Sequence, residues 1–113
     1  MIRNDTRYRF VLVTCGSMAE ARKIGRIIVE KKLAACANII PRIESIYRWK
    51  GKVERAREVL MVIKTSATRV PDLEREVKRA HSYDLPEFIV LPIVAGSKEY
   101  LQWIAENTGG RKI

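Results

Sequence analysis

The sequence predicts an α+β fold in which a four-stranded antiparallel sheet carries two helices on one face. Segments with helical periodicity alternate with β-rich segments in the order β-α-β-β-α-β. The second and third β-rich segments are separated only by Lys50-Gly51, which is typical of a hairpin turn. The length of 113 residues suits one compact domain.

The first part of the chain predicts a strand followed by a helix. Residues 8–15 are almost continuously apolar, which indicates a central strand buried on both faces. A glycine ends this strand, and Ser17 with Glu20 forms a capping-box pattern for a helix that should run to about Lys32. Gly25 lies inside this helix at an energetic cost, which indicates that a strand passes close to it.

The stretch from Leu33 to Lys64 predicts one very long hairpin, because each arm is about twice the typical strand length of about 5–6 residues. Pro41 predicts a bulge or an edge position in the first arm. The tip is charged and aromatic, whereas the base of the return arm is apolar. A domain this small cannot cover such arms, so we expect the tip to meet a partner, with Tyr47 and Trp49 at an intersubunit surface.

The rest of the chain predicts a second helix, a last strand and a terminal helix. Pro71 fits the first turn of the second helix. Residues 88–93 predict the last core strand, and residues 98–107 predict a short helix. That helix should dock through its apolar side chains, Tyr100, Leu101, Trp103 and Ile104.

These elements together predict a ferredoxin-like βαββαβ sandwich with an extended hairpin between its second and third strands and a C-terminal helix. We expect a flexible N-terminal tail over residues 1–7, a single domain over residues 8–107 and a C-terminal tail over residues 108–113.

Charge and hydropathy limit the partners. The chain holds 22 Lys and Arg against 13 Asp and Glu, a formal net charge of +9, which would suit nucleic acid. The two signs alternate closely and no basic block of five occurs, so we prefer a solvated surface. The third strand also lacks the aromatic residues that stack on bases. No signal peptide or membrane-length apolar run occurs, so we expect a cytoplasmic protein without a membrane partner.

Few residues could carry chemistry. No nucleophilic triad and no Walker or GxGxxG pattern occurs, and an anion-binding role for the loop at residues 14–17 is a weak alternative. A metal site must therefore be assembled from scattered residues, of which the candidates are His81, Cys15, Cys36, Glu54, Glu58, Asp84 and Glu87. Soft ligands would favour copper, mercury or zinc. The alternative for His81 is a contact with the last carbonyls of the preceding helix.

Several motifs resemble the CutA divalent-cation tolerance family. They are EKKLAACANIIP at residues 30–41, SIYRWKGK at 45–52, EV at 58–59 followed by IKT at 63–65, HSYDLPE at 81–87, and YLQWI at 100–104. The resemblance extends from about Tyr8 to Asn107.

The resemblance implies a tight homotrimer of ferredoxin-like protomers, similar in architecture to PII signalling proteins, in which the hairpins pair with neighbours. It implies a non-enzymatic cytoplasmic protein that acts in tolerance of divalent cations, with no required cofactor and with Cu(II) or another divalent metal as a candidate ligand. The family's proposed metal-binding histidine corresponds to His81. The chain departs from the family at Arg42, where glycine is usual, at Ser82, where proline is usual, and at Val13, which takes the place of a cysteine.

Two alternatives stay open at this point. The first is a PII-like signalling trimer that binds a small anionic ligand in intersubunit clefts. The second is a nucleic-acid-binding protein attracted by the net charge of +9.

Overall fold

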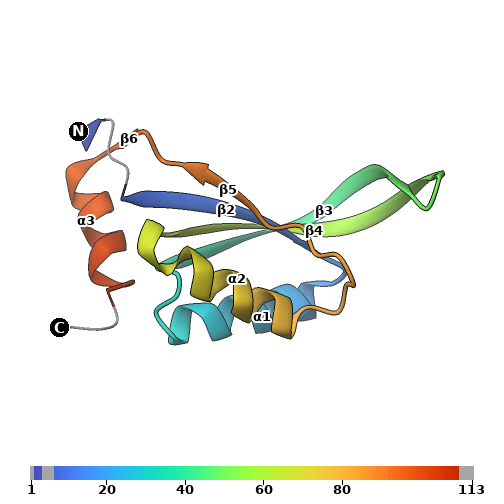
Figure 1. Ribbon diagram of the computed structural model, residues 1–113, viewed down its shortest axis with the longest axis horizontal. Helices are drawn as coiled ribbons and strands as arrows, with labels where there is room; N and C mark the ends of the chain where they lie inside the picture. Colours follow the sequence, from blue (N-terminus) through green and yellow to red (C-terminus); the bar gives the residue numbers. More distant parts are fainter. Residues whose placement is uncertain (1, 4–6, 110–113) are drawn as a thin grey trace.

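The computed structural model describes residues 2–3 and 7–109 (Figure 1). Its main sheet is antiparallel and contains β2 (Tyr8–Cys15), β3 (Cys36–Trp49), β4 (Lys52–Ser66) and β5 (Ile89–Pro92). The strand order is β3-β4-β2-β5. Two helices, α1 (Met18–Glu30) and α2 (Val70–Ala80), lie on one face of this sheet (Figure 1). The predicted ferredoxin-like arrangement is therefore confirmed.

Smaller elements complete the fold. A 3-10 turn (Ala67–Arg69) precedes α2, and the predicted proline lies in the first turn of that helix. The helix α3 (Lys98–Glu106) lies at the end of the sheet opposite the hairpin tip (Figure 1). Of its four expected docking residues, Leu101 and Ile104 are buried, whereas Tyr100 and Trp103 stay partly exposed. In the described part of the chain, no helix is long and apolar enough to cross a membrane.

The two chain ends are only partly described. The strands β1 (Ile2–Arg3) and β6 (Ala95–Gly96) pair in a small antiparallel sheet. Near the other end, Thr108 is buried, and its hydroxyl donates to the Ile104 carbonyl at 2.8 Å. The predicted tails at residues 1–7 and 108–113 otherwise fall mostly outside the described residues, so their limits stay a prediction.

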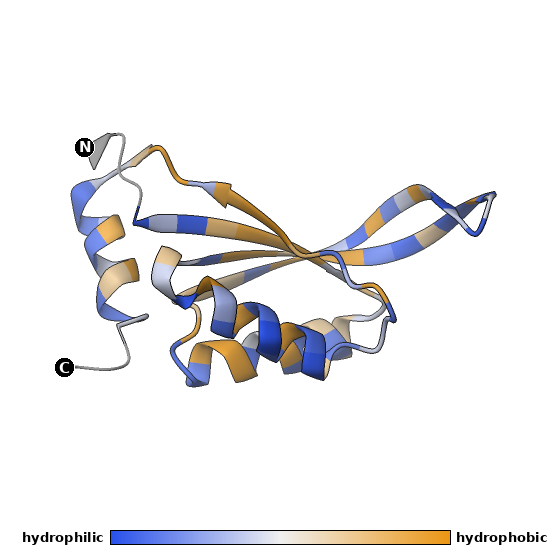
Figure 2. Cartoon of the chain, in the orientation of Figure 1, coloured by the Kyte–Doolittle hydropathy of each residue, from blue (hydrophilic) through white to orange (hydrophobic). Residues whose placement is uncertain are grey.

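The core lies between the sheet and the two helices. Val11, Val13 and Cys15 of β2 are completely buried beneath them. Hydrophobic and hydrophilic residues alternate along both helices (Figure 2), and the buried residues include Ile24 and Ile28 of α1 and Leu73 and Val77 of α2. On the other face of β2, Phe10 and Leu12 are only half-buried. The expectation of burial on both faces is therefore wrong only for the middle of this face in the single chain, because Tyr8 and Thr14 at its two ends are buried, and Tyr8 packs with Leu101 and Ile104 of α3.

The hairpin of β3 and β4 projects from the body. Its strands contain 14 and 15 residues, so the predicted length is confirmed. β2 pairs with β4 only up to Val59, which lies opposite Cys15, and β4 then pairs with β3 alone. The molecule consequently measures 46 × 26 × 22 Å. At the turn, Lys50 and Gly51 have φ values of 51° and 82°, as the twist of a two-residue hairpin requires.

A bulge interrupts β3 where the sequence predicts one. The pairing register shifts between Ile40 and Ile43, and the two residues between them are Pro41 and Arg42. β3 is also an edge strand, so both parts of the prediction are confirmed. Arg42 has a φ of 62°, a left-handed conformation that costs about 1–2 kcal/mol for a residue with a side chain.

Gly25 on α1 gives a test of this packing. A Cβ atom there would lie 3.6 Å from both Ala37 Cβ and Met61 Cε, so β3 and β4 pass close by, as expected. These are ordinary contacts, and we expect Gly25→Ala to raise the free energy of unfolding by about 0.5–1 kcal/mol because alanine favours the helix. Gly25→Leu should lower it by about 1–3 kcal/mol through overpacking. Urea unfolding followed by circular dichroism measures both, and a destabilised alanine variant would contradict the packing described.

Candidate metal centre and neighbouring cleft

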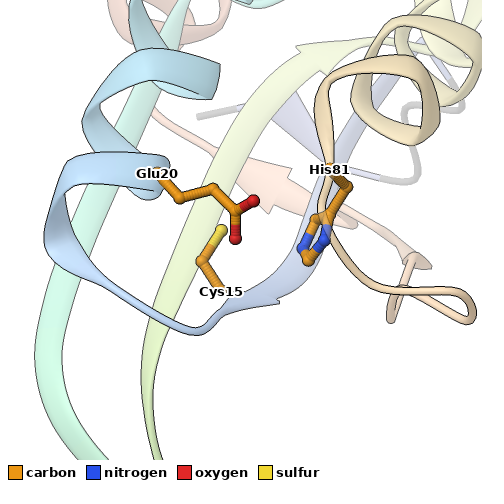
Figure 3. A group of neighbouring side chains, drawn as sticks. All are labelled: Cys15, Glu20 and His81. Carbon is orange, nitrogen blue, oxygen red and sulfur yellow. The ribbon is translucent and has the colours of Figure 1, made fainter.

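Three potential metal ligands converge where β2 ends. The ligand atoms of Cys15, Glu20 and His81 all lie within 4.8 Å of one another. The three side chains come from the last residue of β2, the first turn of α1 and the segment after α2, and they extend toward a common space (Figure 3). They form the single group of three or more such ligands in residues 2–3 and 7–109.

The position of the Glu20 carboxylate in this group is not predicted by the capping pattern. The Ser17 hydroxyl accepts the amide of Glu20 at 3.1 Å, so the helix cap itself is confirmed. The carboxylate of Glu20, however, accepts the amide of Ser82 at 2.9 Å, across the gap between α1 and the segment after α2. Sequence reasoning missed Glu20 as a ligand because it assigned this carboxylate to the start of its own helix.

His81 is held by hydrogen bonds at both ring nitrogens. The Tyr83 amide donates to Nδ1 at 3.1 Å, and Nε2 lies 2.7 Å from the carbonyl oxygen of Thr14. Since Nδ1 accepts a hydrogen, Nε2 must carry one and donate it to Thr14. The expected contact with the last carbonyls of α2 is wrong, because the ring turns toward β2 instead. A metal ion would have to replace one of these two hydrogen bonds.

Cys15 is a protonated thiol inside the core. It is completely buried, and its Sγ donates to the Met61 Sδ at 3.7 Å. Burial raises the pKa of Cys15 to about 12, and the charges of Glu20 and Glu58 act in the same direction. A metal ion would therefore have to displace the thiol proton, which makes binding dependent on pH. Cys36, on the edge strand β3, is not part of the group.

The donor set fits a borderline or soft ion. Sulfur, nitrogen and oxygen ligands together suit copper or zinc better than magnesium. Metal–ligand bonds of about 2.0–2.3 Å would place two ligand atoms at most about 4.6 Å apart, and the three ligand atoms here all lie within 4.8 Å of one another. A small movement of the side chains would be enough, and three protein ligands leave a fourth position open.

A cleft of about 770 Å³ lies between the hairpin tip and residues 83–87. It is lined by Thr14, Glu44, Ser45, Ile46, Tyr47, Arg48, Trp49, Glu58, Tyr83, Leu85, Pro86 and Glu87. The two predicted intersubunit residues, Tyr47 and Trp49, therefore line this cleft, with exposed fractions of 43% and 40%. His81, the predicted metal ligand, is not among the lining residues.

Tyr83 lies between the metal ligands and the cleft. Its ring centroid is 4.7 Å from that of His81, and its hydroxyl donates to the Glu58 carboxylate at 2.8 Å. Burial and this hydrogen bond raise the pKa of Tyr83, so the phenol stays protonated. Across the cleft, burial and the charge of Glu58 raise the pKa of Glu87.

The acid stability of the protein should report the Glu20 contact. Burial raises the pKa of Glu20, but hydrogen bonds from the side chain and amide of Ser82, with contributions from His81 and Gly16, lower it overall below its usual 4.5. A carboxyl with a lowered folded-state pKa contributes stability above pH 4.5, and this stability is lost as the pH falls through the folded-state value.

We therefore expect wild type to lose thermal stability more steeply than Glu20→Gln as the pH falls below 4.5. Unfolding temperatures measured across the acid range check this, with the exposed Glu99→Gln as the matched control. Parallel pH profiles for wild type and Glu20→Gln would contradict the contact with Ser82.

Comparison with known proteins finds relatives that match most of the chain. A divalent-cation tolerance protein CutA of Thermus thermophilus is 48% identical over 99 residues, covering 88% of this chain and 96% of that protein. The human protein CutA is 50% identical over 96 residues, covering 85% of this chain, although the chain spans only 54% of the human protein. An Arabidopsis thaliana relative, 45% identical over 98 residues, covers 87% of this chain and 54% of that protein and is named as chloroplastic.

Solved structures agree with the fold. The divalent cation tolerance protein of Thermus thermophilus superposes with a TM-score of 0.89 at 46% identity, covering 90% of this chain and 99% of that chain. A protein of Archaeoglobus fulgidus, described as a periplasmic divalent cation tolerance protein, gives a TM-score of 0.87 at 42% identity, with coverage of 89% and 98%. The sequence model of the CutA1 divalent ion tolerance proteins matches residues 9–107. The chain therefore belongs to the CutA1 divalent ion tolerance protein family.

Proposed function

We propose that this chain acts without catalysis in the response to divalent and heavy metal ions, with copper as the candidate ion. The observation that carries the proposal is the convergence of Cys15, Glu20 and His81. A thiol, an imidazole and a carboxylate are ligands that Cu(II) and Zn(II) accept. Two relatives bear names that refer to divalent-cation tolerance, which supports the same class of ligand.

Metal binding by this group should be weak and reversible. The ion must displace the proton of a buried thiol whose pKa is about 12. It must also take His81 from the Thr14 carbonyl or from the Tyr83 amide. Each loss opposes binding, so the site suits a sensor or buffer of excess metal better than a permanent metal centre.

Calorimetric titration with Cu(II) tests the site. We expect wild type to bind, and His81→Ala and Cys15→Ser each to bind at least about tenfold more weakly, because each loses one of three ligands. Cys36→Ser is the matched control, since that cysteine lies outside the group. Equal heats for wild type and His81→Ala would remove His81 from the site.

We further propose that the chain assembles as a homotrimer through the open sheet face and the hairpin. On the face without helices, Phe10 and Leu12 are half-buried, and Ile40 and Ile89 are 44% and 50% exposed. The tip adds Ile46 and Val53, which are 68% and 66% exposed. Apolar surface of this extent is typical of a protein–protein interface.

Size-exclusion chromatography with light scattering tests the assembly. We expect wild type to be a trimer, and Ile46→Lys combined with Val53→Lys to shift it toward the monomer, because the changes would bury charge in the interface. Gln102→Lys on the exposed surface of α3 adds charge elsewhere and should leave the mass unchanged. A stable wild-type monomer would overturn the proposed role of the hairpin.

Two free cysteines, Cys15 and Cys36, support a reducing compartment, and we propose the cytoplasm.

The alternative of a PII-like trimer that binds a small anion is less well supported. The cleft beside the hairpin carries three carboxylates, Glu44, Glu58 and Glu87, and only one cation, Arg48. The chemistry that this chain contributes beside the hairpin therefore does not favour an anionic ligand.

A further inference from the structure

We propose that the groove between the end of α1 and the neighbouring α2 binds the phosphate group of a small, soluble anion. The groove has a volume of about 590 Å³, which lies within the range of small-molecule sites, about 300–1,000 Å³. Four cationic side chains, two carboxylates and one leucine line it. Because its wall is charged almost throughout and contains no aromatic ring, it suits a compact, polar ligand better than a nucleobase.

The carboxylates of the groove are too few to neutralise its cations. Asp72 is shared by Arg75 and by Arg69, whose Nη1 lies 3.8 Å from the carboxylate. Glu76 is shared by Lys31 and Arg79, whose nitrogens lie 3.1 and 2.6 Å from the same oxygen, Oε1. Four cations against two carboxylates leave an excess of two positive charges, which attracts an anion and which a dianion would balance.

The exposed cations keep hydrogen-bond donors for a second acceptor. Arg75 and Arg79 each donate to their carboxylate through Nη2, and both side chains are 71% exposed. A guanidinium has five N–H donors in a planar fork, so most of them stay available to a ligand. A phosphate group can accept two parallel hydrogen bonds from one guanidinium and still has oxygens for another cation. The donor pattern therefore favours phosphate.

Arg69 adds a donor that lies within the wall of the groove. Its side chain is only 21% exposed, and the contact with Asp72 is long. Among the buried side-chain nitrogen and oxygen atoms of residues 2–3 and 7–109, the Nε of Arg69 alone has no hydrogen-bond partner. A buried donor without an acceptor is destabilising. A phosphate bound in the groove would supply an acceptor after a small rotation of this side chain.

The groove is separate from the other surfaces described above. It lies beside the helices that cover one face of the sheet (Figure 1), whereas the proposed trimer uses the open face and the hairpin. No residue of the candidate metal centre or of the hairpin cleft lines it. The groove is therefore accessible in a monomer and in such a trimer, and loss of phosphate binding can be distinguished from loss of metal binding or of assembly.

Calorimetric titration of the full chain with inorganic pyrophosphate, in buffer free of metal ions, tests the proposal. Malonate is the matched anion, since it joins two carboxylates through one carbon but has no phosphate group. We expect pyrophosphate to bind at least about tenfold more tightly, because phosphate offers more acceptor oxygens to several cations at once. The proposal is overturned if pyrophosphate fails to bind or if malonate binds as tightly. It is also overturned if a double-stranded DNA oligonucleotide displaces pyrophosphate at an equal concentration of phosphate groups, which would assign the surface to nucleic acid.

Charge-removing variants locate the site. We expect Arg75→Gln and Arg79→Gln each to weaken pyrophosphate binding by roughly tenfold, the usual effect of losing one hydrogen bond to a charged group. Arg22→Gln removes the same charge from an exposed position of α1 outside the groove and should bind like wild type. Circular dichroism confirms folding, and either folded variant alone is sufficient. Wild-type affinity in a folded groove variant, or an equal loss in Arg22→Gln, would overturn the assignment.

A variant with the opposite expected effect separates a ligand site from a purely structural role. Asp72→Asn removes the carboxylate that holds Arg69 and Arg75, so both guanidinium groups become available to the ligand. We expect pyrophosphate to bind roughly two- to fivefold more tightly, since a partly exposed ion pair competes only weakly. Glu99→Gln on α3 removes one negative charge outside the groove and should bind like wild type. Unchanged or weaker binding by a folded Asp72→Asn protein would contradict the proposal.

Discussion

The difference in length between β2 and β4 is the constraint from which the other features follow. β2 stops at Cys15, opposite Val59, while β4 continues for several residues with β3 as its only partner. On one side of this point, the strands lie under two helices and form the core. On the other side, β3 and β4 project from the core as a two-stranded hairpin (Figure 1). A single change in strand pairing thus produces both the stable body and the projecting arm.

The end of β2 also lies beside both the candidate metal centre and the cleft. Where the strand stops, the chain turns into α1 and brings Cys15 and Glu20 next to the segment that follows α2. Glu58 is the first residue of β4 beyond the last pair with β2, and it lines the cleft together with residues of the 83–87 loop. Tyr83 contacts His81 on one side and Glu58 on the other. Tyr83 therefore contacts both the candidate metal ligands and the cleft.

Local patterns predicted the elements, and long-range contacts decided the rest. The hairpin turn and the close approach at Gly25 follow from glycine, which lacks a side chain and can adopt positive φ, and the bulge follows from proline, which lacks a backbone donor. The partners of Glu20 and His81 lie 62 and 67 residues away in sequence, at Ser82 and Thr14, so no periodicity could indicate them. The partial exposure of Phe10 and Leu12 on β2 was not predicted, because a continuous apolar run indicates a buried strand without showing what covers each face.

The bulge at Pro41 and Arg42 also restricts how the edge strand β3 can pair with another chain. β3 is an edge strand of 14 residues, and a straight edge of that length would accept any extended chain as a further strand. The bulge divides this edge into two shorter stretches, and the proline removes one backbone donor at the break. Only a partner whose own strand changes register at the same place can follow the whole edge. The left-handed conformation of Arg42 is thus part of the break that divides this edge.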